Sequence, residues 1–211
     1  VALQVRSGEV SAALGHLAEC GYLGINVTVP LKEEAFDWLD RADEFSKAVA
    51  AANEIEEMLG TGIFIRGMSN LEAAQEADIA VLTVPYAAHR DTLESLKEEL
   101  KGKVLVDVTV PLVPPKVATV QMPAAGSAAQ EAKEIVGEGV QVCSAFQNIS
   151  HEHLMDNAAV ECDVLVTGTS KEARAETIKL VEAAGLKGWD AGPIENSVVV
   201  EGLTSILIGI N

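Results

Sequence analysis

One short sequence, a β-branched run closed by a proline, recurs three times in this chain. "VTVPL" occurs at residues 27–31 and again at 108–112, and "LTVPY" occurs at 82–86. Such a run predicts a buried strand, and the proline predicts its end, because proline has no N–H to donate to a central ladder. The residues around the three copies differ, so we interpret them as separate strand ends rather than as an internal repeat.

Segments with helical spacing alternate with predicted strands along most of the chain. Alternating strands and helices predict an α/β fold with a Rossmann-like, doubly wound parallel sheet. The composition agrees, because 48% of the residues are hydrophobic and only 4% aromatic, which suits buried strands rich in Val, Ile and Leu. Strands are predicted at 1–5, 24–30, 62–67, 79–85, 103–111, 140–146, 162–168 and 186–192. Helices are predicted over about 32–59, 86–100, 127–135 and 171–184, and from Pro193 onwards.

Two local signals predict helix ends, and a change in the sequence pattern predicts a domain boundary. Ser69 and Glu72 have the spacing of a capping box, and Gly185 is placed to stop a helix. Near residue 150 the pattern changes. We therefore expect a nucleotide-binding domain over 1–150 and a small C-terminal α/β domain over 151–211.

Charge and cysteine content exclude several classes of protein. The formal net charge of −17 repels phosphate backbones, so we expect no nucleic-acid partner. No apolar run reaches membrane-spanning length, so we expect no membrane partner. The three cysteines lack CxxC spacing, which argues against a disulfide framework or zinc site and favours a cytoplasmic location. The segment "HEH" at 151–153, with Asp156 nearby, could suggest a metal site. No third ligand is evident, so we expect no metal.

The glycine-rich turn of a typical nucleotide-binding sheet is absent from the sequence. Pyrophosphate needs close backbone approach at a helix N-terminus, hence a GxGxxG turn after the first strand. This chain has "RSGE" there instead. Arg6, Ser7 and Gly8 are the candidates to contact a phosphate, although Glu9 opposes one.

From about residue 62 to 211 the chain resembles NADPH-dependent coenzyme F-420 reductases. The resemblance rests on segments that follow one another in the family's order: "IRGMSNLEAAQEADIAVLTVPYAAHRDTL", "KGKVLVDVTVPLVPPKV", "GSAAQEAKEIVGEGVQVCSAFQNIS", "CDVLVTG" and "DAGPIENSVVVEGLTSILIGIN". It implies an oxidoreductase that transfers a hydride between reduced coenzyme F-420, which is 8-hydroxy-5-deazaflavin, and NADP. The implied cofactors are therefore NADP and coenzyme F-420.

The same resemblance implies which residues contact the cofactors. One set borders the nicotinamide ribose, namely Thr83, Val84, Pro85 and Tyr86, with His89 one helical turn on as a phosphate contact or as a solvated helix histidine. A second set borders the deazaflavin, namely Ser144, Ala145, Phe146, Gln147 and Asn148, and Leu203 is a further cofactor contact. The alternatives are an ordinary strand end for the first set and a structural turn joining two domains for the second.

Residues 1–55 resemble instead the substrate domain of shikimate dehydrogenases. "GYLGINVTVPLKEEAFDWLD" and "AVAAANEI" carry this likeness, in which Lys32 matches the catalytic lysine and Asn53 a substrate-binding asparagine. That family's catalytic Asp has no match here. The chain therefore reads as a mosaic, or chimera. Two alternative functions follow: a shikimate-dehydrogenase-like NADP oxidoreductase that uses Lys32, or an inactive mosaic that lacks the phosphate-binding loop.

The final predicted helix is apolar on most sides. We expect such a helix to be buried, either in the core or in a homodimer interface. Its apolar residues are Val198, Val199, Val200, Leu203, Ile206, Leu207 and Ile210.

Overall fold

The computed structural model describes residues 69–149 and 162–210. The chain divides into two compact units, Val1–Ala73 and Ala74–Asn211. The strands and helices expected before residue 69 lie outside the described residues, as do the "HEH" segment and the expected boundary near residue 150.

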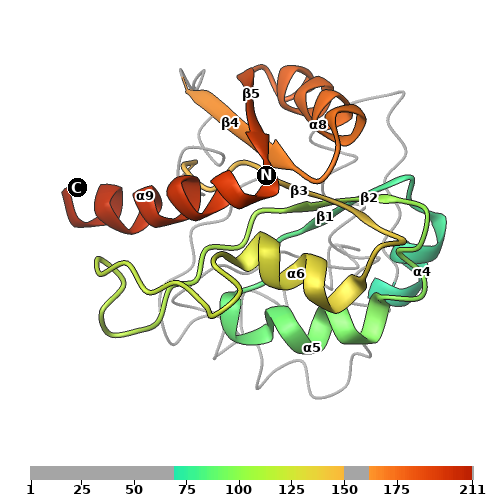
Figure 1. Ribbon diagram of the computed structural model, residues 1–211, viewed down its shortest axis with the longest axis horizontal. Coiled ribbons are helices and arrows are strands. Elements are labelled where there is room, and N and C mark those ends of the chain that lie inside the picture. The colour runs from blue at the N-terminus through green and yellow to red at the C-terminus, as the bar shows by residue number, and fades with distance from the viewer. Residues whose placement is uncertain (1–68, 150–161, 211) are drawn as a thin grey trace, which may run out of the picture. The chain divides into compact units, whose positions relative to one another are not determined.

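Five strands form one mixed sheet in the order β1-β2-β3-β4-β5 (Figure 1). Strands β1, β2 and β3 are parallel, as predicted, but β4 is antiparallel to β3, and β5 is again parallel to β4. Strands β4 and β5 therefore both run opposite to β1, β2 and β3, and mixed sheets of this kind are common among α/β folds. The strands expected for a C-terminal domain thus extend the same sheet. Their bounds are Ile79–Leu82 for β1, Val104–Asp107 for β2, Gln141–Ser144 for β3, Asp163–Gly168 for β4 and Lys187–Pro193 for β5.

Helices cover both faces of this sheet. Helices α5 and α6 lie on one face and α8 on the other (Figure 1). Neighbouring residues of β2 therefore enter different cores: Leu105 packs in the cluster with Leu93, and Val106 packs in the cluster with Val181. The helices are α4 (Asn70–Glu76), α5 (Tyr86–Leu96), α6 (Ala128–Val136), α8 (Lys171–Ala183), the short 3-10 helix η1 (Ile194–Asn196) and α9 (Ser197–Ile210).

The predicted helix ends are confirmed, with one exception. The Glu72 carboxylate accepts hydrogen bonds from the Ser69 backbone N–H (3.0 Å) and hydroxyl (2.8 Å), which completes the capping box. Gly185, at φ +77°, follows the end of α8, as expected for a glycine stop. Helix α5 ends at Leu96 rather than at Leu100. Turns follow it, and Gly102, at φ +79°, leads the chain into β2.

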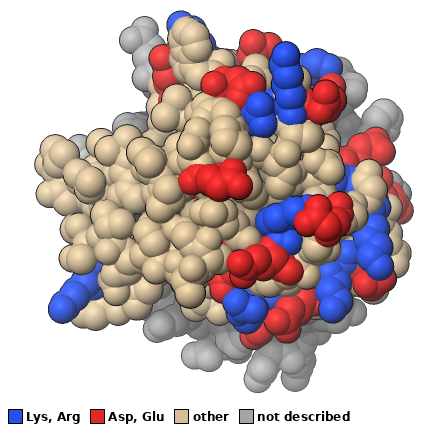
Figure 2. Space-filling model, viewed as in Figure 1, with Lys and Arg blue, Asp and Glu red and all other residues tan. Residues whose placement is uncertain are grey.

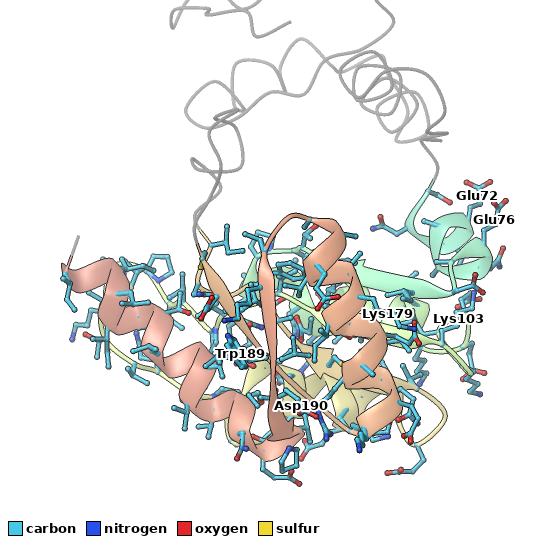
Figure 3. All side chains as sticks on the ribbon, turned by 90° about the horizontal axis from the view of Figure 1, so that it is seen from above. Glu72, Glu76, Lys103, Lys179, Trp189 and Asp190 are labelled. Atoms are coloured by element: carbon cyan, nitrogen blue, oxygen red, sulfur yellow. The ribbon has the colours of Figure 1, made fainter. Side chains whose placement is uncertain are left out.

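A lysine at the start of the sheet caps the C-terminal end of α4. Lys103 Nζ donates to the carbonyl oxygens of Ala74 and Gln75, the latter at 2.6 Å (Figure 3). A cation at this end of a helix pairs with unsatisfied carbonyls and with the helix dipole. The interaction ties the last residues of this helix to the residue that precedes β2.

A long segment, 108–126, connects β2 to α6 and follows the inner side of α9. A Cβ added to Gly202 would lie 3.4 Å from Val120 Cγ1, and one added to Gly209 would lie 3.1 Å from Ala118 Cβ. These two glycines lie seven residues apart, close to two helical turns, so they share one side of α9. The segment packs against that side because the glycines leave room for it.

Helix α9 buries most of its polar side chains and exposes most of its large apolar ones. Ser197, Glu201 and Thr204 are buried, whereas Val199 is 69% and Ile210 74% exposed. The prediction that this helix is buried as core holds for Val200 and is wrong for the other apolar residues that were named. Figure 2 shows that the surface around α9 carries very few charged side chains. No helix among the described residues is both long and apolar enough to span a membrane.

The hydroxyl of Ser170 caps α8, and its removal should lower stability. Ser170 Oγ accepts from the Ala173 backbone N–H at 3.1 Å. We expect Ser170→Ala to lower the free energy of unfolding by about 1 kcal/mol, because the N–H loses its partner. Urea unfolding measures this. The control is Ser95→Ala, whose hydroxyl bonds only a carbonyl of its own helix and which should change stability by less than about 0.5 kcal/mol. Equal losses in both variants would contradict the capping role.

Candidate active site

Three turns meet at one edge of the sheet, where the parallel strands end. Leu82, Asp107 and Ser144 are in register as the last residues of β1, β2 and β3. The turns that follow them therefore lie at the same edge, which is where open α/β sheets bind ligands. The structure thus brings together the two predicted groups of site residues, Thr83–Tyr86 and Ser144–Asn148.

Asp107 joins these turns. Its side chain is fully buried. Oδ1 accepts from the Thr109 backbone N–H at 2.9 Å, and Oδ2 lies 2.8 Å from His89 Nε2. Its backbone carbonyl accepts from Gln147 Nε2 at 2.8 Å. A buried carboxylate requires donors, and here they come from α5 and from the turn after β2. The turn after β3 is held by the backbone carbonyl of the same residue.

His89 is buried beneath this edge rather than solvated, so the interpretation as a solvated helix histidine is wrong. A carboxylate only accepts hydrogen bonds, so His89 donates to Asp107 from Nε2. Nδ1 is buried, has no hydrogen-bond partner among the described residues and lies 3.8 Å from Glu131 Oε2. A direct contact between His89 and a cofactor phosphate stays a prediction.

A second polar group connects the start of α5 to α6. The Tyr86 hydroxyl donates to Glu131 Oε2 at 3.0 Å, and the Arg90 guanidinium pairs with Oε1 of the same carboxylate. Partial burial, followed by the hydrogen bond to Glu131, raises the pKa of Tyr86 to about 12. Tyr86 therefore keeps its proton at physiological pH and acts as a donor.

The turn after β3 has an unusual backbone. Phe146 has φ +70°, in the left-handed region that a bulky residue rarely adopts. Gln147 Nε2 also donates to Ser144 Oγ at 2.7 Å, and Thr204 of α9 donates to the Gln147 carbonyl at 3.2 Å. Gln147 Oε1 is buried without a partner among the described residues. Backbone outliers of this kind cluster at functional sites, where the surroundings enforce them.

A buried carboxyl group fastens α9 to the N-terminal end of α6. Glu201 Oε2 accepts from the Ala128 backbone N–H at 2.6 Å, and Oε1 accepts from that of Ala129 at 3.1 Å. Beside it the hydroxyls of Ser127 and Ser197 lie 2.6 Å apart. Desolvation by burial outweighs the two amide donors and raises the pKa of Glu201 to about 8.

The remaining predicted site residues are exposed or lie outside the described residues. Asn148 is exposed, and its amide donates to the Asp163 carbonyl at 2.9 Å, which links the turn after β3 to β4. Leu203 is 43% exposed on the outer face of α9. Arg6, Ser7, Gly8 and Lys32 lie outside the described residues.

Three acidic residues of this site were missed by sequence reasoning. Asp107 and Glu201 are single charges within apolar runs, "VLVDVTV" and "VVVEGLTSILIGI". Charged residues are almost never fully buried unless they are paired, so a lone acid in an apolar strand or helix is a usable signal. Glu131 carries no such signal, because its helix contains other charged residues.

Fold and edge together define an α/β protein of the Rossmann type, with its ligand edge at the ends of β1 to β3. Coenzyme F-420 is abbreviated F420 in the names of the similar proteins. A family model described as "NADP oxidoreductase coenzyme F420-dependent" matches residues 11–111. The F420-dependent NADP reductase of Methanocaldococcus jannaschii is 34% identical over 205 residues, covering 95% of this chain and 91% of that protein. This chain belongs to that family.

Other similar proteins extend the comparison. The F420-dependent NADP reductase of Methanothermobacter marburgensis is 35% identical and covers 95% of this chain and 91% of its own length. A crystal structure assigned as such a reductase, from an Arthrobacter species, has a TM-score of 0.62 at 19% identity, over 98% of this chain and 90% of that one. At that identity it shows the fold alone, and it confirms the Rossmann-like expectation.

The likeness to the reductases includes the amino-terminal segment. An alignment that covers 95% of the chain includes most of residues 1–55, and the family match begins at residue 11. The likeness to the reductases thus starts earlier than the quoted motifs indicate. The shikimate dehydrogenase of Moorella thermoacetica also matches, at 35% identity, but over only 36% of this chain and 27% of that protein.

The raised pKa of Glu201 predicts a pH-dependent stability. The ordinary pKa of this carboxyl is 4.5 and its folded pKa is about 8. Between these values the folded protein holds a proton that the unfolded chain has released, so the free energy of unfolding falls as the pH rises. Glu201→Gln removes this group. Relative to the variant, the wild type should lose stability by up to about 1.4 kcal/mol per pH unit in this window. Urea unfolding of both proteins across the window measures the difference, and parallel curves would contradict the buried, proton-holding carboxyl.

Proposed function

We propose that this chain transfers a hydride between reduced coenzyme F-420 and NADP. One observation of the structure carries the proposal: the parallel register of β1, β2 and β3 sets the turns Thr83–Tyr86 and Ser144–Asn148 at one edge of the sheet, where Asp107 links α5 to the turn after β3. Membership of the reductase family supports it independently.

The arrangement suits a reaction that needs orientation rather than acid–base catalysis. Hydride transfer requires two rings held in register, and the cofactors supply the chemistry. The turn Thr83–Tyr86 would hold the nicotinamide ribose, and the turn Ser144–Asn148 would hold the deazaflavin. Contacts from Arg6, Ser7 and Gly8 to the NADP phosphates remain part of this proposal.

Shikimate oxidation is not supported to the same extent. The match to shikimate dehydrogenase covers about a third of this chain and a smaller part of that enzyme. Lys32, its expected catalytic residue, lies outside the described residues. We therefore do not extend the proposal to this activity.

A hydride-transfer assay tests the proposal. Purified protein, reduced coenzyme F-420 and NADP are mixed, and the return of the oxidised deazaflavin absorbance is followed. We expect protein-dependent turnover with NADP, because both turns and the residue that links them, Asp107, are in place. Omission of NADP is the control. A folded protein that gives no turnover would favour the inactive mosaic, in which the absent glycine-rich turn abolishes NADP binding.

We further propose that the protein is a cytoplasmic homodimer formed through the outer face of α9. Val199, Ile206 and Ile210 are exposed on a helix whose single charged residue, Glu201, is buried. Large exposed apolar patches commonly mark protein interfaces. The free cysteines Cys143 and Cys162 agree with a reducing compartment.

A charge placed on this face should separate the subunits. We expect Ile206→Glu to convert a dimer into a monomer, because burying the new carboxylate against apolar side chains is costly. Size-exclusion chromatography with light scattering measures the mass. Leu71→Glu is the control, because it adds the same charge at an exposed leucine of α4. A monomeric wild type, or a dimer that survives Ile206→Glu, would contradict this interface.

A further inference from the structure

We propose that His89 is a positioning residue for hydride transfer, acting through Asp107 on the turns that hold the two cofactors. The inference rests on the proposed function and deepens it. Its starting point is the buried pair formed by His89 Nε2 and Asp107 Oδ2 at 2.8 Å, in which neither side chain is exposed.

Asp107 has one donor from the described residues at each carboxylate oxygen. The Thr109 N–H occupies Oδ1, and His89 occupies Oδ2. Loss of the His89 donor would leave a buried oxygen unsatisfied, and the side chain would have to rotate or admit water to recover a partner. Either change would release Thr109 from its present place.

The loss of the His89 donor would affect all three turns, because Asp107 is linked to the turns after β1, β2 and β3. Its carbonyl holds Gln147 and also accepts from the Ala145 N–H at 3.3 Å. The Thr109 hydroxyl lies 3.4 Å from the Val84 carbonyl, and His89 itself lies on α5, which begins at Tyr86. A shift of Asp107 would therefore move the nicotinamide turn and the deazaflavin turn relative to each other.

The surroundings of His89 disfavour a direct chemical role. The ring is fully buried, with Asp107 at Nε2 and Glu131 3.8 Å from Nδ1. Two neighbouring carboxyl groups disfavour a phosphate at this place, and the buried ring has no exposed atom to take up the proton that the reduced deazaflavin releases together with its hydride. What remains is control of geometry, and a misplacement of about 1 Å can cost about a hundredfold in rate.

Two variants of similar size distinguish this role. In His89→Gln the amide nitrogen can still donate toward Asp107, whereas His89→Leu fills the space without a donor. We expect His89→Leu to lower kcat roughly ten- to a hundredfold, with KM for both cofactors changed less than about threefold, because positioning is lost and binding is not. His89→Gln should stay within about fivefold of wild-type kcat. Steady-state kinetics in the F-420 assay measure both constants.

A control separates positioning from a general loosening of α5. Leu96→Ala removes a buried side chain from the same helix without touching Asp107. Melting temperatures identify how far each variant is destabilised. We expect Leu96→Ala to melt earlier and yet keep its kcat. Should His89→Leu fail to fold, His89→Asn, whose amide is too short to reach Asp107, replaces it with the same expectation.

Each result decides between the alternatives. Full kcat in His89→Leu, or an equal loss of kcat in Leu96→Ala, would overturn the positioning role while leaving the proposed function intact. A rise in KM with unchanged kcat would assign His89 to binding instead and would also overturn it. An inactive but folded wild type would contradict the proposed function and, with it, this inference.

Discussion

The buried carboxylate of Asp107 is the interaction on which the site depends. It ends a strand that is buried between two cores, so its charge has to be compensated by protein donors. Those donors are the Thr109 N–H and the His89 ring. Satisfying this charge therefore links α5 to the turn after β2. The backbone carbonyl of the same residue accepts from Gln147 and so adds the turn after β3.

A second buried acid explains the position of the final helix. Glu201 binds the first amides of α6, and small residues such as Gly202 allow the segment 108–126 to approach α9 closely. Polar side chains thus point inward, and the large apolar ones other than Val200 are left outside. The usual relation between hydrophobicity and burial is inverted along this helix, which is why α9 is the natural candidate for contact with a second subunit. Thr204 connects the same helix to the deazaflavin turn through the Gln147 carbonyl.

Local rules predicted much of the described fold. The capping box at Ser69 and the glycine stop at Gly185 depend on neighbours in sequence, and both lie where expected. Strands β1 and β2 lie within the predicted runs, but they end at Leu82 and Asp107, three and four residues before the prolines that were expected to end them. The direction of β4 was not predictable, because no local pattern distinguishes a parallel from an antiparallel strand. The burial of His89 was also missed, since its helix is polar around it and its partner Asp107 lies eighteen residues away.

The sequence by itself determined the α/β class, the order of strands and helices, the family resemblance and the two turns that border the proposed cofactor sites. These follow from periodicity, from strand-ending prolines and from motifs of adjacent residues. Only the tertiary structure decided which acids are buried, which side of α9 faces inward and how Asp107 joins the turns. Those features are set by contacts between segments far apart in the chain, and burial of a charge becomes visible only when its donors are in place.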